Sequence, residues 1–277
     1  MLKVIEPGLY SSIQDNGRFG YRNIGVPYSG FMDQECANIA NYILGNNETD
    51  SLIEITLKGP TLLFNDNYTI SITGGDFNAI LNNEKINMYN PVEVKLGDML
   101  KFSHTKNGAR CYLAVSGGID IKKLLGSRSL YKSITQSYCL RKGDEIKILN
   151  KSNKKKHNQS KLTFKIDNYI YAFKGPEFSV LDQKSLNKLF KNEFEIGVNN
   201  RMAYNLEDKI QTGVKSIISS PVLPGTTQLT PSGNIIILHR DCQTTGGYSR
   251  ILQLDEKSLN NLSQFKLGEK IKFKLLN

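Results

Sequence analysis

The stretch LIEITLKGPTLLFNDNYTISITGGD, residues 52–76, carries the clearest indication of the fold class. It holds three short apolar runs, and residues typical of turns separate each run from the next. Short strands with turns every eight to twelve residues are typical of antiparallel barrels and sandwiches, whereas a doubly wound parallel sheet needs long crossover helices. The stretch therefore predicts an antiparallel barrel or sandwich.

The same pattern continues along the rest of the chain. Further strands are predicted over 3–5, 9–13, 92–94, 99–102, 111–115 and 235–238. Helical patterns are few and short. Helices are expected after the N-caps Asp33, Asp182 and Asp255, with Gly45 ending the first, and another short helix is expected over 121–125. The predicted fold class is mainly β with a few short helices.

Internal echoes indicate two related halves. A turn of glycine and an acidic residue leads into a strand three times, at Gly97-Asp98, Gly143-Asp144 and Gly268-Glu269. We interpret these units as a duplication suited to closing a β-barrel, with chance similarity of turns as the alternative. A polar, lysine-rich tract separates the halves. The expected organisation is an N-terminal domain (1–150), a basic linker (151–161) and a C-terminal domain (162–277).

The candidate binding segment is the polar loop Asp241-Cys242-Gln243-Thr244-Thr245-Gly246-Gly247-Tyr248-Ser249-Arg250. It follows four consecutive aliphatic residues, which predict a buried strand that holds it. A carboxylate, two threonine hydroxyls, an amide and a guanidinium converge within this loop. We expect Gly246 and Gly247 to allow positive φ and to turn backbone N–H groups toward an anion or a carbonyl. The alternative is a satisfied polar turn between two strands.

Length and composition exclude several classes of protein. The 277 residues suffice for two domains with their own cores. No apolar run approaches the roughly 20 residues of a membrane span, so we expect a cytoplasmic protein without a membrane segment. The net charge of +10 lies largely in lysine-rich segments without interleaved aromatic residues, so we expect no nucleic-acid partner. An acidic partner protein or an anionic small substrate explains the positive net charge equally well.

Several familiar centres are absent from the sequence. The four cysteines are widely separated and form no CxxC pair, so we expect free thiols and no metal site. Only Cys242 lies in the candidate loop, where His239 is the nearby histidine. No GxxxxGK[ST], HExxH or GxSxG motif occurs. No lysine stands in a Met-Lys-Met context, so no covalent biotin is expected on this chain.

The runs GLYSSIQDNGRFGY (8–21) and GVPYSGFMD (25–33) resemble the start of the allophanate hydrolase subunit 2 family, whose members are also called biotin-dependent carboxyltransferase family proteins. The resemblance continues in the same order over most of the chain. Its further segments are 54–60, YLAVSGGID (112–120), LGSRS (125–129), PGTTQ (224–228) and 241–248. No single segment is specific, but together they identify the chain as a member of this family.

The resemblance implies two cyclophilin-like β-barrel domains and an enzyme subunit. The family includes the C subunit of the bacterial ATP-dependent 5-oxoprolinase, which hydrolyses 5-oxo-L-proline to L-glutamate. The implied partners are a KipI-like subunit and a LamB/YcsF-like subunit. ATP is then used by the complex, at a site that the sequence does not locate in this chain, and the chain is expected to be inactive alone.

The family motifs also select the candidate site residues, and side-chain chemistry suggests their roles. Asp241 and Asp15 are expected to act as a general base or to orient one, and Arg128 is expected to stabilise negative charge. The candidate substrate-binding residues are Arg18, Tyr21, Gln228, Gln243, Thr244, Thr245, Gly246, Gly247 and Tyr248.

Two other functions stay open. The family resembles part of the carboxyltransferase region of urea carboxylase, so the chain could move a carboxyl group from a partner's carboxybiotin to urea or a related amide. Members similar to KipA act on a sporulation histidine kinase, which would make the chain a regulatory binding protein. A neighbouring gene for a biotin carboxylase would favour the first, and one for a LamB/YcsF-like protein would favour 5-oxoprolinase.

Overall fold

The computed structural model describes residues 1–149, 157, 164–210 and 213–276. The chain divides into two compact units: unit 1 comprises Met1–Arg18 and Ser29–Lys165, and unit 2 comprises Phe19–Tyr28 and Ile166–Asn277. Residues 19–28 thus pack with unit 2, although their place in the sequence assigns them to the first half. Apart from His157, the linker predicted over 151–161 lies outside the described residues.

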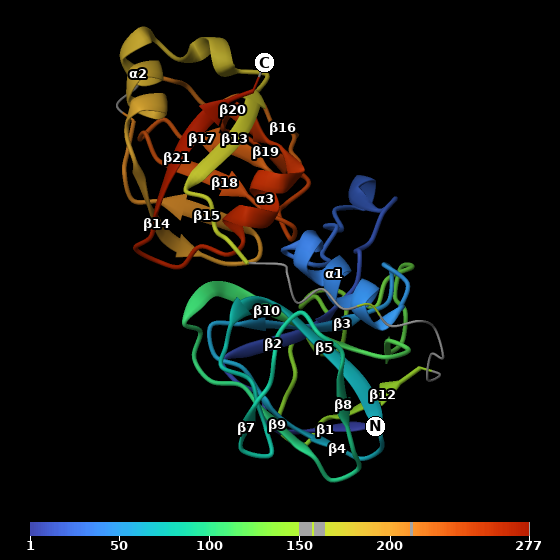
Figure 1. Cartoon of the computed structure of the whole chain (residues 1–277). Helices are drawn as coiled ribbons and strands as arrows, with labels where there is room; N and C mark the ends of the chain where they lie inside the picture. The colour runs from blue at the N-terminus through green and yellow to red at the C-terminus, as the bar shows by residue number, and fades with distance from the viewer. Residues whose placement is uncertain (150–156, 158–163, 211–212, 277) are drawn as a thin grey trace. The chain divides into compact units, whose positions relative to one another are not determined.

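The described strands of unit 1 form two antiparallel sheets (Figure 1). The strand order is β11-β12-β1-β4-β9-β6-β7 in the first and β2-β3-β10-β5-β8 in the second. The strands are β1 Leu2–Glu6, β2 Tyr10–Gln14, β3 Leu52–Thr56, β4 Thr61–Phe64, β5 Tyr68–Asp76, β6 Ile80–Leu81, β7 Glu84–Lys85, β8 Val92–Val94, β9 Met99–Lys101, β10 Asn107–Val115, β11 Ile119–Asp120 and β12 Glu145–Ile148. Aliphatic side chains of both sheets, such as Val4, Leu62, Ile55 and Leu113, share one core.

The predicted helix α1 (Gln34–Leu44) packs on β5 and β10 of unit 1. The Asp33 carboxylate caps it by accepting a backbone N–H of the first turn at 3.0 Å, and Gly45 ends it with a φ of 65°. The hydroxyls of Ser71 and Thr73 donate to helix carbonyls at 2.6 Å. These contacts fix the helix on the second sheet.

Unit 2 is built on a closed barrel with the strand order β13-β20-β17-β18-β15-β14-β21 (Figure 1). Neighbouring strands are antiparallel except β13 and β21, which run parallel and complete the closure. The strands of unit 2 are β13 Tyr169–Lys174, β14 Phe194–Asn199, β15 Ala203–Leu206, β16 Ser220–Pro221, β17 Thr226–Leu229, β18 Ile235–Leu238, β19 Thr245–Gly246, β20 Ser249–Leu254 and β21 Lys270–Leu275. Strand β18 is the predicted strand before the candidate loop, and β16 and β19 form a separate ladder.

The helices of unit 2 are short. They are η1 Arg22–Ile24, η2 Phe178–Val180, α2 Gln183–Lys191 and α3 Glu256–Leu262. Asp182 and Asp255 cap α2 and α3 as predicted, each accepting the N–H three residues on, at 2.7 and 2.8 Å. The predicted fold class, mainly β with a few short helices, is confirmed. Within the described ranges, no helix is long and apolar enough to cross a membrane.

The predicted turn of glycine and an acidic residue has the same geometry at all three places. Gly97, Gly143 and Gly268 have φ angles of 91°, 90° and 85°. The acidic residue that follows each glycine accepts the backbone N–H of the residue three positions before it, at 2.7, 2.8 and 2.8 Å. Glycine takes this φ without the steric cost that a Cβ brings, which explains its recurrence before β9, β12 and β21.

The helix predicted over 121–125 is wrong. Leu124 and Ser127 instead form a bridge, in which each N–H donates to the other residue's carbonyl at 2.8 and 3.2 Å. Between them, Leu125 and Gly126 have φ angles of 52° and 78°, as in a tight two-residue turn. The turn-forming glycine therefore outweighed the apolar residues that suggested a helix.

Candidate functional site

Asp15 follows strand β2 and binds a second loop of unit 1 through its carboxylate. The carboxylate accepts the hydroxyls of Ser127 and Ser129, both at 2.6 Å, and the backbone N–H groups of Arg128 at 2.6 Å and Gly17 at 2.9 Å. Asp15 is 6% exposed. Because a carboxylate accepts about four hydrogen bonds, these donors fill its capacity. In this geometry Asp15 holds the loop in place.

Arg18 is buried against the same loop. Its Nε donates to the carbonyl of Leu124 at 3.2 Å, and its Nη2 donates to the carbonyl of Ser129. Ser129 thus receives Arg18 at its carbonyl while its hydroxyl donates to Asp15. These contacts connect the two candidate residues through one serine.

Arg128 joins this group through both its backbone and its side chain. Its backbone N–H donates to Asp15, while its side-chain Nε donates to the carbonyl of Ile121 at 3.1 Å. Its Nη2 lies 3.7 Å from the carboxylate of Asp120, which is half exposed. Unit 1 therefore brings Asp15, Arg18 and Arg128 together. The family motifs had selected each of these residues but had not indicated that they lie close to one another.

A cavity of about 310 Å³ lies in unit 1 beside this loop. Ile13, Leu124 and Leu130 contribute aliphatic walls, and Ser137 and Cys139 contribute polar groups. The volume is sufficient for a small organic molecule. Its walls adjoin the backbone that carries Asp15 and binds Arg18.

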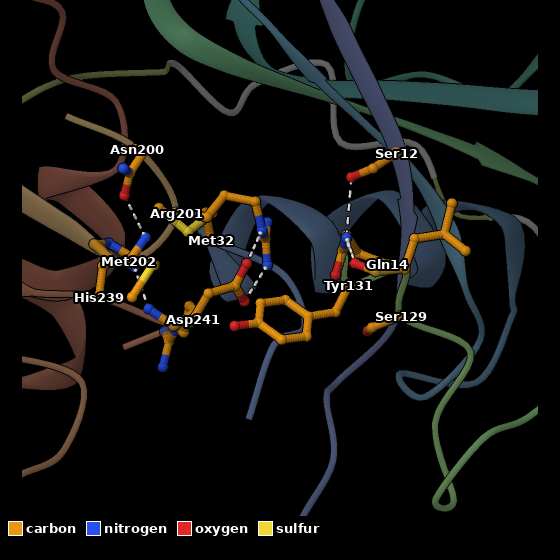
Figure 2. Close-up of polar contacts among 12 residues, drawn as sticks. Ser12, Gln14, Met32, Ser129, Tyr131, Asn200, Arg201, Met202, His239 and Asp241 are labelled. Carbon is orange, nitrogen blue, oxygen red and sulfur yellow. Dashed lines mark hydrogen bonds and ion pairs between the residues drawn. The ribbon is translucent and has the colours of Figure 1, made fainter. Parts of the chain in front are cut away.

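In unit 2, Asp241 forms a bidentate ion pair with Arg201 (Figure 2). Arg201 Nε lies 2.8 Å from Oδ2 and Nη2 lies 3.2 Å from Oδ1, and the two side chains are 9% and 6% exposed. The backbone N–H of Asp241 also donates to the carbonyl of Arg201 at 2.9 Å. A buried fork of this kind fixes both side chains, so Arg201 determines where the Asp241 carboxylate lies.

His239 does not activate Cys242. Its Nδ1 accepts the backbone N–H of Arg240 at 2.9 Å, so this nitrogen carries no proton, and its Nε2 then donates to the carbonyl of Leu259 at 3.0 Å. Burial raises the pKa of the Cys242 thiol to about 11, although the nearby Arg22 guanidinium opposes the shift. Cys242 is therefore protonated at neutral pH and is no poised nucleophile.

The candidate loop forms one edge of the β16–β19 ladder. Ser220 pairs with Gly246 and Pro221 pairs with Thr245. On either side, the backbone N–H of Val222 donates to the carbonyl of Thr244 at 3.1 Å and that of Ile217 to Gly247 at 2.9 Å. The side chains of Gln243, Thr245 and Tyr248 are exposed, and Thr244 is half-buried.

The expectation that Gly246 and Gly247 take positive φ is wrong, because neither residue has a positive φ and Gly246 pairs with Ser220 in the ladder. Glycine at 246 has a different reason. A Cβ added there would lie 2.4 Å from Nε2 of Gln228, whereas at Gly247 the nearest atom is the carbonyl oxygen of Ile217 at 3.6 Å. The absence of a Cβ at 246 therefore leaves room for the end of the Gln228 side chain.

Gln228 lies in β17 and is 1% exposed. Its Nε2 has no hydrogen-bond partner in the part of the chain that the structure describes. Its cross-strand neighbour Arg250 is instead fully committed. Arg250 donates to Glu177 at 2.7 and 2.8 Å and to the carbonyl of Pro221 at 2.9 Å. Arg250, the arginine of the candidate loop, therefore has hydrogen-bond partners within the protein, whereas the buried Nε2 of Gln228 has none among the described residues.

Arg22 of η1 contributes a second guanidinium to this part of unit 2. Its Nη2 donates to the carbonyls of Val222 and of Gln243, the latter at 3.1 Å. Its guanidinium carbon lies 4.8 Å from the centre of the Tyr28 ring. Its Nη1 is buried and has no hydrogen-bond partner among the described residues. Tyr21, a predicted binding residue, is half-buried and immediately precedes η1.

Arg22 and Arg201 were not predicted from the sequence. Arg201 lies in the run 199–204, which echoes 16–21, so its correspondence with Arg18 was a usable signal. Arg22 lies beside Tyr21 in a turn-rich segment, and nothing local marks its contacts about 200 residues away.

The described residues hold no cluster of metal ligands, and the three α-helix starts are unsuited to phosphate. No group of three or more His, Cys, Asp or Glu side chains there could hold a metal ion. Helices α1, α2 and α3 each begin at an aspartate, Asp33, Asp182 or Asp255, whose carboxylate already accepts a first-turn N–H. A carboxylate at this position repels phosphate from the helix end.

Comparison with known sequences gives near full-length and partial matches. The chain is 32% identical to the 5-oxoprolinase C subunit of Escherichia coli K12 over 280 residues, which cover 99% of this chain and 90% of that protein. It is 44% identical to the urea amidolyase of Saccharomyces cerevisiae over 131 residues, which cover 47% of this chain and 7% of that one.

Solved structures agree in fold over the whole chain. The crystal structure of TTHA0988 superposes with a TM-score of 0.88 at 27% identity, covering 99% of this chain and 55% of that one. The structure of the K. lactis urea amidolyase gives 0.91 at 29% identity, covering 100% of this chain and 19% of the other. The chain thus spans about half of TTHA0988 and a fifth of the amidolyase. Because the family model "Carboxyltransferase domain, subdomain A and B" matches residues 24–275, the chain belongs to this carboxyltransferase-domain family.

Proposed function

We propose that this chain is the C subunit of an ATP-dependent 5-oxoprolinase, which hydrolyses 5-oxo-L-proline to L-glutamate together with two partner subunits. One observation carries the proposal: the similarity to the E. coli 5-oxoprolinase C subunit extends over nearly the whole of both chains. The similarity to urea amidolyase covers only a small part of a much longer enzyme. We assign the partner roles to a KipI-like and a LamB/YcsF-like subunit.

The reaction requires activation of a stable lactam. Transfer of a phosphoryl group from ATP to the amide oxygen leaves ADP and makes the carbonyl carbon a better electrophile. Water adds to that carbon, the ring C–N bond breaks with the nitrogen taking a proton, and hydrolysis releases phosphate. Since the described helix starts of this chain carry aspartate caps, we assign ATP to the complex and none of its phosphates to these helices.

The geometry favours orienting roles for the two aspartates. Asp15 accepts four hydrogen bonds, and Asp241 is paired with Arg201, so neither carboxylate is placed as an unengaged base. We propose that Asp15 positions the loop that carries Arg128. Within unit 1, Arg128 then stabilises developing negative charge.

Reconstitution tests this function. The chain is co-expressed with its KipI-like and LamB/YcsF-like partners, each subunit is omitted in turn, and ATP-dependent release of glutamate from 5-oxoproline is measured. We expect release only when all three subunits are present. A stable three-subunit complex that releases no glutamate would contradict the proposal.

Carboxyl transfer is the second candidate, favoured by the TM-score of 0.91 with the K. lactis urea amidolyase. In this reaction the carboxyl group leaves the ring nitrogen of carboxybiotin and forms a new C–N bond with urea. The biotin would be supplied by a partner. Incubating the complex with free carboxybiotin and urea distinguishes the two functions, because formation of carboxylated urea would replace the oxoprolinase assignment.

A further inference from the structure

We infer that Arg22 and Gln228 form a carboxylate-binding site in unit 2, against the β16–β19 ladder. The inference deepens the proposed function, since 5-oxoproline and glutamate both carry a carboxylate. It rests on that function only for the choice of probe, because the residues themselves define the ligand class.

Gln228 supplies a neutral donor. The side chain is 1% exposed, and its Nε2 finds no acceptor among the described residues. A buried amide without a hydrogen bond keeps an uncompensated desolvation penalty, so such a group needs a reason to persist. Glycine at 246 preserves its position, because a Cβ there would lie 2.4 Å from Nε2.

Arg22 supplies the positive charge. Each of the other arginines of unit 2 has a carboxylate partner: Arg201 pairs with Asp241, Arg240 with Glu256 and Arg250 with Glu177. Within the described residues, Arg22 contacts carbonyls, the Tyr28 ring and the Cys242 thiol, and no carboxylate pairs with it. Its Nη1 is buried without an acceptor. A guanidinium in this setting lacks its counter-charge.

The two donors border the same residue, Val222. The carbonyl of Val222 accepts from Arg22 Nη2. The Val222 Cγ1 atom lies 3.4 Å from the position of a Cβ at Gly246, and Gln228 Nε2 lies 2.4 Å from that same position. Arg22 therefore contacts the backbone of Val222, and the Gln228 amide lies near its side chain, beside the β16–β19 ladder.

This donor set matches a carboxylate. One positive charge balances one negative charge, and the Arg22 and Gln228 N–H groups can each bind one carboxylate oxygen. The ladder that adjoins them joins only two residue pairs, Ser220 with Gly246 and Pro221 with Thr245.

Calorimetric titration of the full chain tests the site. The probes are 5-oxo-L-proline, L-glutamate and 5-oxo-L-prolinamide, in which a neutral amide replaces the carboxylate. The variants are R22Q, Q228M and the control K184Q, which removes one positive charge from an exposed position of α2 in the same unit. Thermal melts establish that each variant is folded, and the side-chain ¹⁵N amide signal of Gln228 reports directly on its environment.

We expect R22Q and Q228M to weaken binding of 5-oxoproline at least tenfold, and K184Q to change it less than twofold. The prolinamide should bind at least tenfold more weakly than 5-oxoproline, and the Gln228 signal should shift only with the carboxylates. Three outcomes would overturn the site. Folded R22Q and Q228M could bind 5-oxoproline as tightly as the wild-type chain does, or the wild-type chain could bind the prolinamide as tightly as 5-oxoproline. The third outcome is that neither carboxylate shows saturable binding. Arg22-dependent binding of glutamate without binding of 5-oxoproline would keep the site and contradict the oxoprolinase function.

Discussion

Gly246 and Gly247 are neighbours, but only at Gly246 would an added Cβ overlap another atom. Neither has a positive φ, so an alanine is penalised only by what its Cβ meets. We expect G246A to destabilise the chain by about 1–3 kcal/mol, because its Cβ collides with the Gln228 amide. G247A is the matched control and should change stability by less than about 0.5 kcal/mol. Urea unfolding of both variants measures the difference.

A double substitution identifies the cause. In Q228A/G246A the colliding side chain is gone, so the cost of G246A should largely disappear in the double-mutant cycle. If the two costs simply add, Gly246 is required for some reason other than its contact with Gln228.

Loss of the Asp15 carboxylate should destabilise unit 1. Asparagine offers one acceptor oxygen where the carboxylate binds four donors, so D15N leaves buried donors unsatisfied. We expect D15N to lower the free energy of unfolding by about 2–4 kcal/mol. The control D144N changes a carboxylate that accepts a single backbone N–H in an exposed turn, and it should cost less than about 1 kcal/mol. Equal costs would show that the Asp15 network contributes little.

Glu177 links stability to pH. Hydrogen bonds from Arg250 lower its pKa below the usual value and outweigh the opposing effect of burial. The folded-state pKa then lies below that of the unfolded chain, so the stabilisation is complete above the unfolded-state pKa and is lost as the pH falls through the folded-state pKa. We expect the stability difference between wild type and E177Q to shrink from pH 7 to pH 3 in urea titrations. A difference that grows on acidification would contradict this assignment.

At the scale of elements, the repeated turn before β9, β12 and β21 gives a uniform prediction. Gly97, Gly143 and Gly268 have positive φ but no atom within 4 Å of an added Cβ. Alanine at each should therefore cost about 1–2 kcal/mol, which is the cost of the left-handed backbone alone. Gly247 has no positive φ, and its added Cβ would meet no atom closer than 3.6 Å, so it is the control and should tolerate alanine. Widely different costs among the three turns would show that they are not equivalent.

Elements that depend on local signals could be predicted from the sequence. Asp33, Asp182 and Asp255 mark helix starts because a cap acts within one turn of its own helix. The segment 121–125 was mispredicted because Leu125 adopts a positive φ that apolar spacing does not reveal. Barrel closure by the parallel pair β13 and β21 joins distant segments and leaves no local trace.

The candidate site also has a part that the sequence indicated and a part that only the folded chain shows. The family motifs selected Asp15, Arg128 and Gln228, but the contacts of Asp15 with Ser127 and Ser129 span more than 110 residues and became visible only in the folded chain. The role of Arg22 depends on backbone carbonyls, which every residue has, so no sequence pattern could indicate it.

At the scale of the whole molecule, each unit holds its own polar cluster. Unit 1 gathers Asp15, Arg18 and Arg128, and unit 2 contains the Arg201–Asp241 pair and, beside Val222, Arg22 and Gln228. The near full-length similarity to the E. coli 5-oxoprolinase C subunit covers both units. We therefore regard the complete chain, and neither unit alone, as the functional component.

The coupling of glutamate release to ATP hydrolysis tests the proposed function most directly. The two partner subunits are assembled with and without the chain, and glutamate formed from 5-oxoproline is counted per ATP consumed. We predict about one glutamate per ATP with the chain present and no glutamate without it. Glutamate formation at the same ratio in the absence of the chain would contradict the proposed function.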